Sequence, residues 1–139
     1  MNAIPLGAKG SFWTIVAPEH LASRFKDPTL PPVLATPLLL LFMENAALSA
    51  IREHLSPGES ALGTVVNIRH LAATPVGQRV TAEAVVTGVE GRRIVFAVTA
   101  RDETQEIGSG IHERALVDIR RLTERLDAKR NQKTGHPGG

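Results

Sequence analysis

One acidic side chain stands where the sequence is otherwise apolar. Glu44 follows six consecutive apolar residues, 38–43, and the apolar pattern resumes after it. On a helix, the neighbours three and four residues away from Glu44 are all apolar: Leu40, Leu41, Ala47 and Leu48. A charged group on such a stripe costs free energy unless it is paired, hydrogen-bonded or protonated. Glu44 is therefore either a structural carboxylate, held by a backbone amide or an arginine, or a catalytic one.

A histidine on the following strand is the second candidate. The alternation in residues 60–72 puts His70 on one face with Val66 and Ile68, which predicts that its side chain points inward. A single inward histidine is more often structural than catalytic. Glu44 and His70 are nevertheless both predicted to face the interface between helix and sheet. There a carboxylate can act as base or nucleophile while an imidazole holds it or moves a proton.

Two further residues could contribute to such a site. Thr36 precedes Pro37, which is typical of a helix start, but its hydroxyl could also bind a carboxylate or a substrate carbonyl. Eight residues of straight helix separate Thr36 from Glu44 by about 12 Å, so they cooperate only if the chain folds back or a second subunit supplies one of them. Gly63 could simply relieve a strand end, or its backbone N–H could approach an oxyanion closely.

Other chemistries find no support in the 139 residues. The absence of cysteine excludes disulfides, thiolate metal sites and cysteine nucleophiles. No HExxH, GxGxxG, P-loop or GxSxG pattern occurs, so metal hydrolysis, dinucleotide binding and an elbow serine are unsupported. His112 alternates with Gly110 and Arg114 and is interpreted as structural. What remains is a carboxylate and a histidine beside an apolar helix, which suits a substrate with an acyl chain or a small apolar acyl group.

The charge distribution and the end segments of the chain bear on its expected partners and cellular location. The net charge is +2, but residues 119–139 carry six basic and two acidic side chains, or +4, which leaves −2 for the rest. This basic tail is interpreted as a short amphipathic helix with a frayed end. With four Phe, one Trp and no Tyr, a nucleic-acid partner is not expected. The absence of a secretory signal and of a long apolar run predicts a cytoplasmic protein without a membrane partner.

The elements that must position these residues form an α+β pattern. One apolar helix is predicted over 35–55, after an irregular, proline-rich segment over 18–35. Strands are predicted over 10–17, 60–72, 78–89, 92–102 and 105–119, with a hairpin turn at Glu90–Gly91. A helix with such an apolar stripe needs a curved sheet to bury it. The sequence therefore predicts one domain over 1–118, a sheet wrapped around a central helix, followed by the tail.

Four stretches together resemble a known family. They are ATPLLLLFMENAA, ALGTVVNIRHLAATPVG, VEGRRIVFAV and EIGSGIHERA. This sequence is similar to the hot-dog thioesterases related to the fluoroacetyl-CoA-specific thioesterase, from about Val33 to Val117. The resemblance implies a hot-dog fold and a homodimer with active sites near the subunit interface. It also implies hydrolysis of an acyl-CoA thioester, with coenzyme A as part of the substrate and no other cofactor or metal.

The same resemblance assigns roles to residues. It implies that Thr36, Glu44 and His70 form the catalytic set and that Gly63 lies near the acyl carbonyl. The chain departs from the fluoroacetyl-specific member in one respect, because that protein has an aromatic-rich lid before its catalytic threonine. Here the stretch RFKDPTLPPVLAT contains one aromatic residue, Phe25. We therefore expect a general thioesterase for small or medium acyl-CoA rather than a fluoroacetyl-selective one.

Two alternatives keep the same fold. One is a non-catalytic module that binds acyl-CoA or an acyl group, in which Glu44 and His70 are a structural pair. The other is a hot-dog enoyl-CoA hydratase, which also needs an acid and a histidine. The hydratase ranks lower, because no aspartate stands where its usual acid would be.

Overall fold

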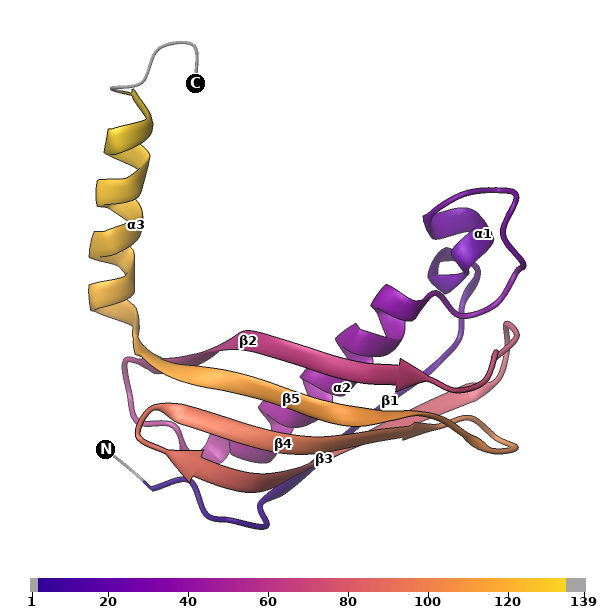
Figure 1. Cartoon of the computed structure of the whole chain (residues 1–139), viewed down its shortest axis with the longest axis horizontal. Helices are drawn as coiled ribbons and strands as arrows, with labels where there is room; N and C mark the ends of the chain where they lie inside the picture. Colours follow the sequence, from indigo (N-terminus) through magenta and orange to yellow (C-terminus); the bar gives the residue numbers. More distant parts are fainter. Residues whose placement is uncertain (1–2, 135–139) are drawn as a thin grey trace.

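The computed structural model describes residues 3–134, which form one sheet, a central helix, a second helix of the same length at the end of the described chain, and short helical segments (Figure 1). The strands are β1 Lys9–Ile15, β2 Glu59–His70, β3 Arg79–Glu90, β4 Arg93–Arg101 and β5 Glu106–Asp118. The helices are α1 Ala22–Phe25, α2 Thr36–Ile51 and α3 Ile119–Thr134, with short 3₁₀ turns at Pro18–His20 and Arg52–His54. Each predicted strand is present, within two residues of its expected bounds.

Helix α2 is the predicted apolar helix, and its two ends differ from the expectation. Its N-cap is Ala35, so Thr36 occupies the first turn with Pro37, and no side chain caps the helix. Thr36 was expected at the N-cap; its hydroxyl is instead free to make another contact. The regular helix ends at Ile51, and a 3₁₀ turn carries the chain to Leu55, which is extended.

The sheet is antiparallel throughout, in the order β1-β3-β4-β5-β2. Its concave side wraps around α2, which confirms the α+β class predicted from the sequence (Figure 1). Strand β2 pairs with β5 on one side only and lies at the sheet edge. Along this edge strand, three apolar side chains, Leu62, Val65 and Val66, are 38–44% exposed. An exposed apolar edge strand is a template for pairing with another chain.

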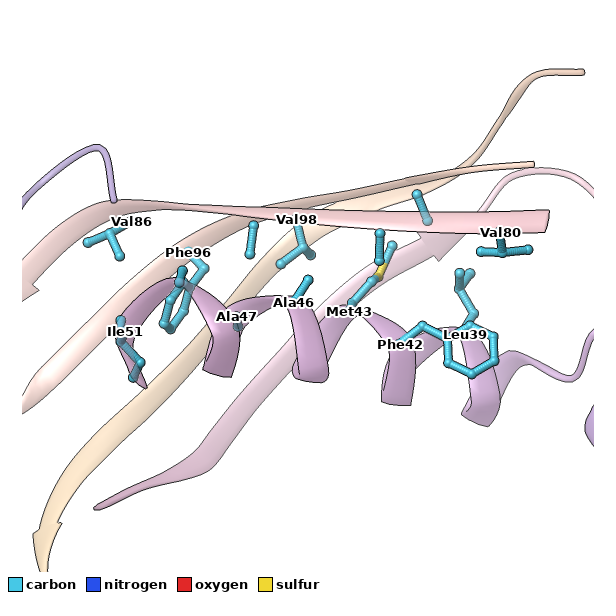
Figure 2. Close-up of a cluster of buried hydrophobic side chains, with 14 of the residues drawn as sticks. Leu39, Phe42, Met43, Ala46, Ala47, Ile51, Val80, Val86, Phe96 and Val98 are labelled. Atoms are coloured by element: carbon cyan, nitrogen blue, oxygen red, sulfur yellow. The ribbon is translucent and has the colours of Figure 1, made fainter. Parts of the chain in front are cut away.

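The core lies between α2 and the sheet (Figure 2). One face of α2 is buried, and its residues are Leu39, Phe42, Met43, Ala46, Ala47, Ala50 and Ile51. Alternate residues of β3 and β4 face them, among them Val80, Val86, Phe96 and Val98 (Figure 2). The alanines let the helix approach β1 so closely that a Cβ on Gly10 would clash with the backbone of Ala46 and Ala50. This close packing fixes the helix against the sheet and so fixes the side chains on its remaining face.

Helix α3 begins where β5 ends and extends away from the sheet on the side of β2 (Figure 1). The Asp118 carboxylate caps it by accepting a hydrogen bond from the backbone N–H of Arg121 at 3.0 Å. The predicted division into a domain over 1–118 and a tail over 119–139 stays a prediction, and residues 135–139 lie outside the described part. Among residues 3–134, no helix combines the length and apolar character needed to cross a membrane.

Candidate active site

Glu44 lies on the half-buried face of α2 and points toward the middle of β2 and β5. A Cβ added to Gly63 would lie 3.0 Å from Glu44 Oε2, 3.4 Å from His112 Cε1 and 3.8 Å from Arg114 Nη1. These four residues therefore converge on one point beside the edge strand. A side chain at this position would crowd the carboxylate, so Gly63 keeps space beside it.

Arg114 supplies a positive charge to this cluster. Its Nη2 donates to the carbonyl of Ala61 at 2.7 Å, and its Nη1 donates to His112 Nε2 at 3.2 Å. Its Nε is buried without a hydrogen-bond partner among residues 3–134. Burial lowers the pKa of the Arg114 guanidinium, and the nearby charge of Glu44 partly opposes that shift. An arginine remains charged under such a shift, so the cluster holds a fixed cation near a carboxylate.

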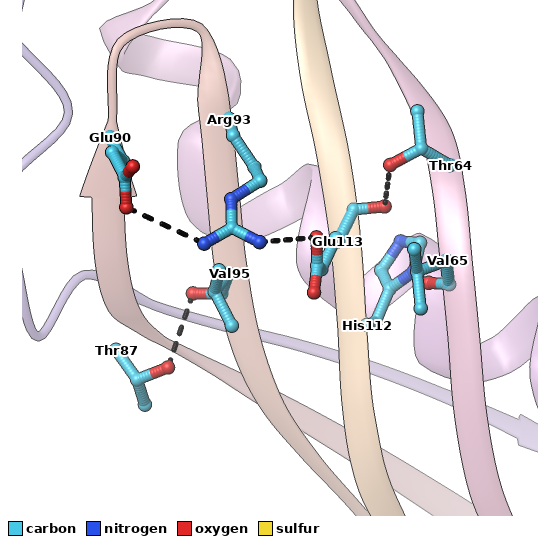
Figure 3. Close-up of polar contacts among 8 residues, drawn as sticks. All are labelled: Thr64, Val65, Thr87, Glu90, Arg93, Val95, His112 and Glu113. Carbon is cyan, nitrogen blue, oxygen red and sulfur yellow. Dashed lines mark hydrogen bonds and ion pairs between the residues drawn. The ribbon is translucent and has the colours of Figure 1, made fainter.

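His112 is fully buried behind these two charged groups. Its Nδ1 lies 2.8 Å from the carbonyl oxygen of Val65, which can only accept, so Nδ1 carries the proton (Figure 3). Nε2 is then the acceptor that receives the Arg114 hydrogen bond. The ring also stacks on Phe96, with centroids 5.7 Å apart. Desolvation lowers the pKa of His112 below its ordinary value of 6.5, so the ring is neutral near pH 7.

A bulge in β2 makes the contact between His112 and Val65. The pairing register of β2 with β5 shifts between Gly63 and Val65, so that Thr64 is the extra residue. A bulge bends its strand and re-aims the groups beside it. Here it coincides with the Val65 carbonyl that binds His112 and with the Gly63 backbone that borders Glu44.

His70 and Thr36 meet at the other end of β2. Thr36 Oγ1 and His70 Nδ1 are 2.8 Å apart and share a hydrogen bond. The His70 ring is partly buried, and its Nε2 is buried without a partner among the described residues. Burial lowers the pKa of His70 below 6.5, and a weaker backbone hydrogen bond at Ala72 opposes this. His70 is therefore a neutral imidazole near pH 7, with one nitrogen oriented by Thr36 and the other available.

A pocket of about 430 Å³ adjoins this pair. Most of its walls are aliphatic, and they come from α1, the loop after it and the segment after β2. The lining residues are Ala22, Lys26, Leu30, Pro31, Val33, Leu34, Thr36, His70, Leu71, Ala72 and Ala73. No aromatic residue other than His70 itself lines the pocket in the described part of the chain.

The expected pairing of Glu44 with His70 does not form within one chain. His70 contacts Thr36, whereas Glu44 lies beside Gly63, His112 and Arg114. Seven residues of β2 separate Gly63 from His70, which corresponds to about 23 Å of extended chain. The pairing was inferred because both side chains were expected at the helix–sheet interface. Within one chain they lie apart, because α2 meets the two ends of β2 with different turns.

Sequence reasoning also missed Arg114 and assigned His112 no more than a structural role. A signal was present, since Arg114 shares the inward face of β5 with His112 and an inward arginine needs a partner. Its hydrogen-bond partners are the Ala61 carbonyl and His112, and Glu44, the one unexplained acid, is the nearby opposite charge. Among residues 3–134, no group of three or more His, Asp or Glu side chains is placed to hold a metal ion.

The curled antiparallel sheet around one helix, with an acid and two histidines near its free edge, defines an α+β protein of the hot-dog thioesterase class. Comparisons with known proteins agree. Residues 16–120 match the fluoroacetyl-CoA-specific thioesterase family. The fluoroacetyl-CoA thioesterase of Streptantibioticus cattleyicolor is 42% identical over 125 residues, 86% of this chain and 87% of that one. The chain therefore belongs to the fluoroacetyl-CoA-specific thioesterase family.

Solved structures give the same result. A structure of the fluoroacetyl-CoA thioesterase superposes with a TM-score of 0.86 at 34% identity, covering 92% of this chain and 98% of that one. A Thermus thermophilus protein of the thioesterase superfamily superposes with a TM-score of 0.91 at 30% identity, covering 98% of this chain and 100% of that one. The hot-dog fold and the family inferred from the sequence motifs are thus confirmed.

Proposed function

We propose that the protein hydrolyses a small or medium acyl-CoA thioester to the free acid and coenzyme A, in a homodimer whose active sites each combine residues of both subunits. Membership of the family makes the chain an acyl-CoA thioesterase. The size of the acyl group, the dimer and the residue roles are inferred from the geometry. The observation that carries them is the separation of the acid cluster from the Thr36–His70 pair along β2.

The two clusters are arranged so that a two-fold axis would join them. On α2, the residue midway between Thr36 and Glu44 is Leu40; on β2, the midpoint between Gly63 and His70 falls between residues 66 and 67. An axis near both midpoints, with β2 paired antiparallel to its copy, brings His70 opposite Gly63 of the partner subunit. It brings Thr36 toward the partner subunit's Glu44 in the same operation. Each dimer then contains two complete sites.

The surface around these midpoints supports such a dimer. The edge of β2 is unpaired and carries Leu62, Val65 and Val66, and the neighbouring face of α2 carries Leu41, which is 45% exposed. Pairing the two edge strands would satisfy their free backbone groups and remove these apolar side chains from water. The dimer also resolves the 12 Å separation of Thr36 and Glu44 expected along one helix.

The chemistry follows from the groups that meet. The thioester carbonyl would lie between the Glu44 carboxylate and the Gly63 backbone N–H, which would stabilise the developing oxyanion. Glu44 acts either as the nucleophile or as the base that activates water; the arrangement serves both. Neutral His70, oriented through Nδ1 by Thr36, would use Nε2 to move the proton that the departing thiolate needs. The positive charge of Arg114 would stabilise the negative charge that develops on the oxygens bonded to the acyl carbon in the transition state.

The pocket beside Thr36 and His70 suits a short acyl chain. Its volume of about 430 Å³ and aliphatic walls favour small or medium apolar groups over a long chain. Phe25, the one aromatic residue of the segment before α2, is 54% exposed and does not line this pocket. This supports a broad preference rather than selectivity for fluoroacetyl-CoA, the compound in the relative's name.

The test is free-thiol release from acetyl-, fluoroacetyl-, butyryl-, hexanoyl-, benzoyl- and phenylacetyl-CoA. Wild type is compared with Glu44→Gln and with Glu53→Gln, a control whose exposed side chain lies outside the site. We expect Glu44→Gln to lower kcat roughly 10³-fold without unfolding the protein, and Glu53→Gln to leave it unchanged. Near-normal hydrolysis by Glu44→Gln would refute the mechanism. Binding of acyl-CoA without hydrolysis by any variant would favour the binding module instead.

The cytoplasmic location, the lack of a nucleic-acid partner and the lack of a resident cofactor stay predictions from the sequence.

A further inference from the structure

Three arginines that the mechanism does not use surround a second concavity. It has a volume of about 600 Å³ and lies between the β3–β4 turn and the first half of α3. The residues that line it are Arg92, Asp118, Arg121, Glu124, Arg125 and Ala128. Arg121 and Arg125 are four residues apart, so they share one face of α3, and Arg92 comes from the turn opposite.

The charges in this concavity are unbalanced in favour of the arginines. Asp118 is engaged as the cap of α3, accepting the Arg121 backbone N–H at 3.0 Å. Glu124 lies 3.8 Å from Arg120, which is not among the residues that line the concavity. The side chains of Arg92, Arg121 and Arg125 make no ion pair among residues 3–134.

The neighbouring Arg93, in contrast, is ion-paired. It binds Glu113 at 3.2 Å and lies 3.5 Å from Glu90 (Figure 3). The chain thus places a paired arginine and an unpaired one side by side in the same turn. Unpaired guanidinium groups from two elements around a hollow are suited to an anion with several charged oxygens, such as a phosphate ester.

The distance between the arginine-lined concavity and the cluster of Glu44 and Gly63 suits one substrate that contacts both. Asp118 pairs with Glu59, and Arg114 pairs with Gly63, so four residues of the β2–β5 ladder separate the concavity from Glu44 and Gly63. That interval is about 13 Å. Arg114 and Asp118 are also on the same face of β5, because they are separated by an even number of residues. Coenzyme A carries its phosphates at the far end of the flexible pantetheine arm, which can bridge this interval.

We propose that Arg92, Arg121 and Arg125 bind the phosphates of the adenosine 3′,5′-diphosphate end of the acyl-CoA substrate. The inference rests on the proposed function and adds a subsite that the catalytic residues do not provide. Contacts to this end are the same in the ground state and the transition state, because it is remote from the reacting carbonyl. They should therefore lower KM and leave kcat unchanged.

The test compares substrates with one acyl group and different carriers. Hydrolysis of the acyl-CoA, of its 3′-dephospho form and of the acyl thioester of N-acetylcysteamine is measured for wild type and for the double variant Arg121→Gln/Arg125→Gln. The control is Arg130→Gln, which removes one positive charge from the same helix at a residue paired with Asp127 and outside the concavity. Binding of adenosine 3′,5′-diphosphate alone is measured by calorimetry for all three proteins.

We expect the double variant to raise KM for the acyl-CoA roughly tenfold with kcat unchanged, and to hydrolyse the N-acetylcysteamine thioester like wild type. Adenosine 3′,5′-diphosphate should bind wild type and Arg130→Gln and not the double variant. An unchanged KM, or an equal rise with both substrates, would overturn the subsite. If wild type hydrolyses no thioester, the proposed function fails, and the calorimetric comparison by itself then decides the subsite: equal binding or no binding overturns it.

Discussion

The two ends of β2 carry two histidines in contrasting surroundings. His112, on β5 beside Gly63, is 1% exposed, and both of its nitrogens are hydrogen-bonded, to Val65 and to Arg114. His70 is partly exposed at a pocket, bonds Thr36 through one nitrogen and keeps the other without a partner in the described chain. The ring with full partners has no capacity left for substrate, whereas the ring with a free nitrogen does.

The difference extends from the rings to the clusters around them. The His112 end holds the charges, Glu44 and Arg114, and the His70 end holds the hydroxyl and the apolar pocket. One end lacks an available proton carrier and the other lacks a carboxylate. Under the proposed function, each end is therefore half of an active site that a second copy of the chain completes.

The largest expected effect is on kcat, when Glu44 is substituted in one subunit and His70 in the other. Glu44→Gln and His70→Ala should each lower kcat about 10²- to 10⁴-fold as homodimers, because each removes a group that transfers a proton or attacks the carbonyl. Unfolding and refolding the two variants together should restore about a quarter of wild-type activity. About half of the dimers would be mixed, and each mixed dimer would contain one intact site.

The same mixing separates the dimer from its alternative. If each site lies within one subunit, every site in the mixture keeps one defect and activity stays at the level of the single variants. A mixture of Glu44→Gln with Glu53→Gln, where one subunit has a harmless exposed change, should keep half of wild-type activity under either arrangement and gives the reference for recovery after refolding.

A stability measurement sharpens the contrast between the two histidines. His112→Ala should lower the free energy of unfolding by roughly 3 kcal/mol, because it leaves a cavity against Phe96 and removes the partners of Val65 and Arg114. His70→Ala should cost about 1 kcal/mol, since it removes one hydrogen bond at a partly exposed position. Urea denaturation at one fixed protein concentration measures both. Equal costs would show that His70 is as structural as His112.

The smallest expected effect is a dependence of stability on pH. Burial lowers the pKa of both His70 and His112 below 6.5, so below that pH the unfolded chain binds protons that the folded chain does not. The free energy of unfolding should therefore be unaffected by these two groups above pH 6.5 and decrease as the pH falls. For His112 we expect this decrease to be seen below pH 6.5, measured as the slope that His112→Gln removes. A slope identical in wild type and His112→Gln would contradict this assignment.

Local pattern in the sequence predicted much of the fold and most of the candidate site residues. The period of two in the strands and the unbroken apolar stripe of α2 depend on near neighbours, and each of these elements is present within a few residues of its expected bounds. Glu44 was identifiable because a carboxylate on an apolar stripe conflicts with its neighbours, and that conflict is local. The roles of Thr36, Glu44, His70 and Gly63 stay predictions.

Contacts between distant segments were decided by the tertiary structure. Arg114 is 70 residues from Glu44 in the chain, and the two charges influence each other because β5 pairs with β2 while both side chains lie beside Gly63. The alternation rule placed His70 inward, but it could not show that α2 would present Thr36 at that point. The sequence by itself indicated the candidate site residues and determined which elements hold them. Only the packing of helix on sheet, set by side chains such as the alanines facing Gly10, decided that the acid and the histidine lie apart in one chain.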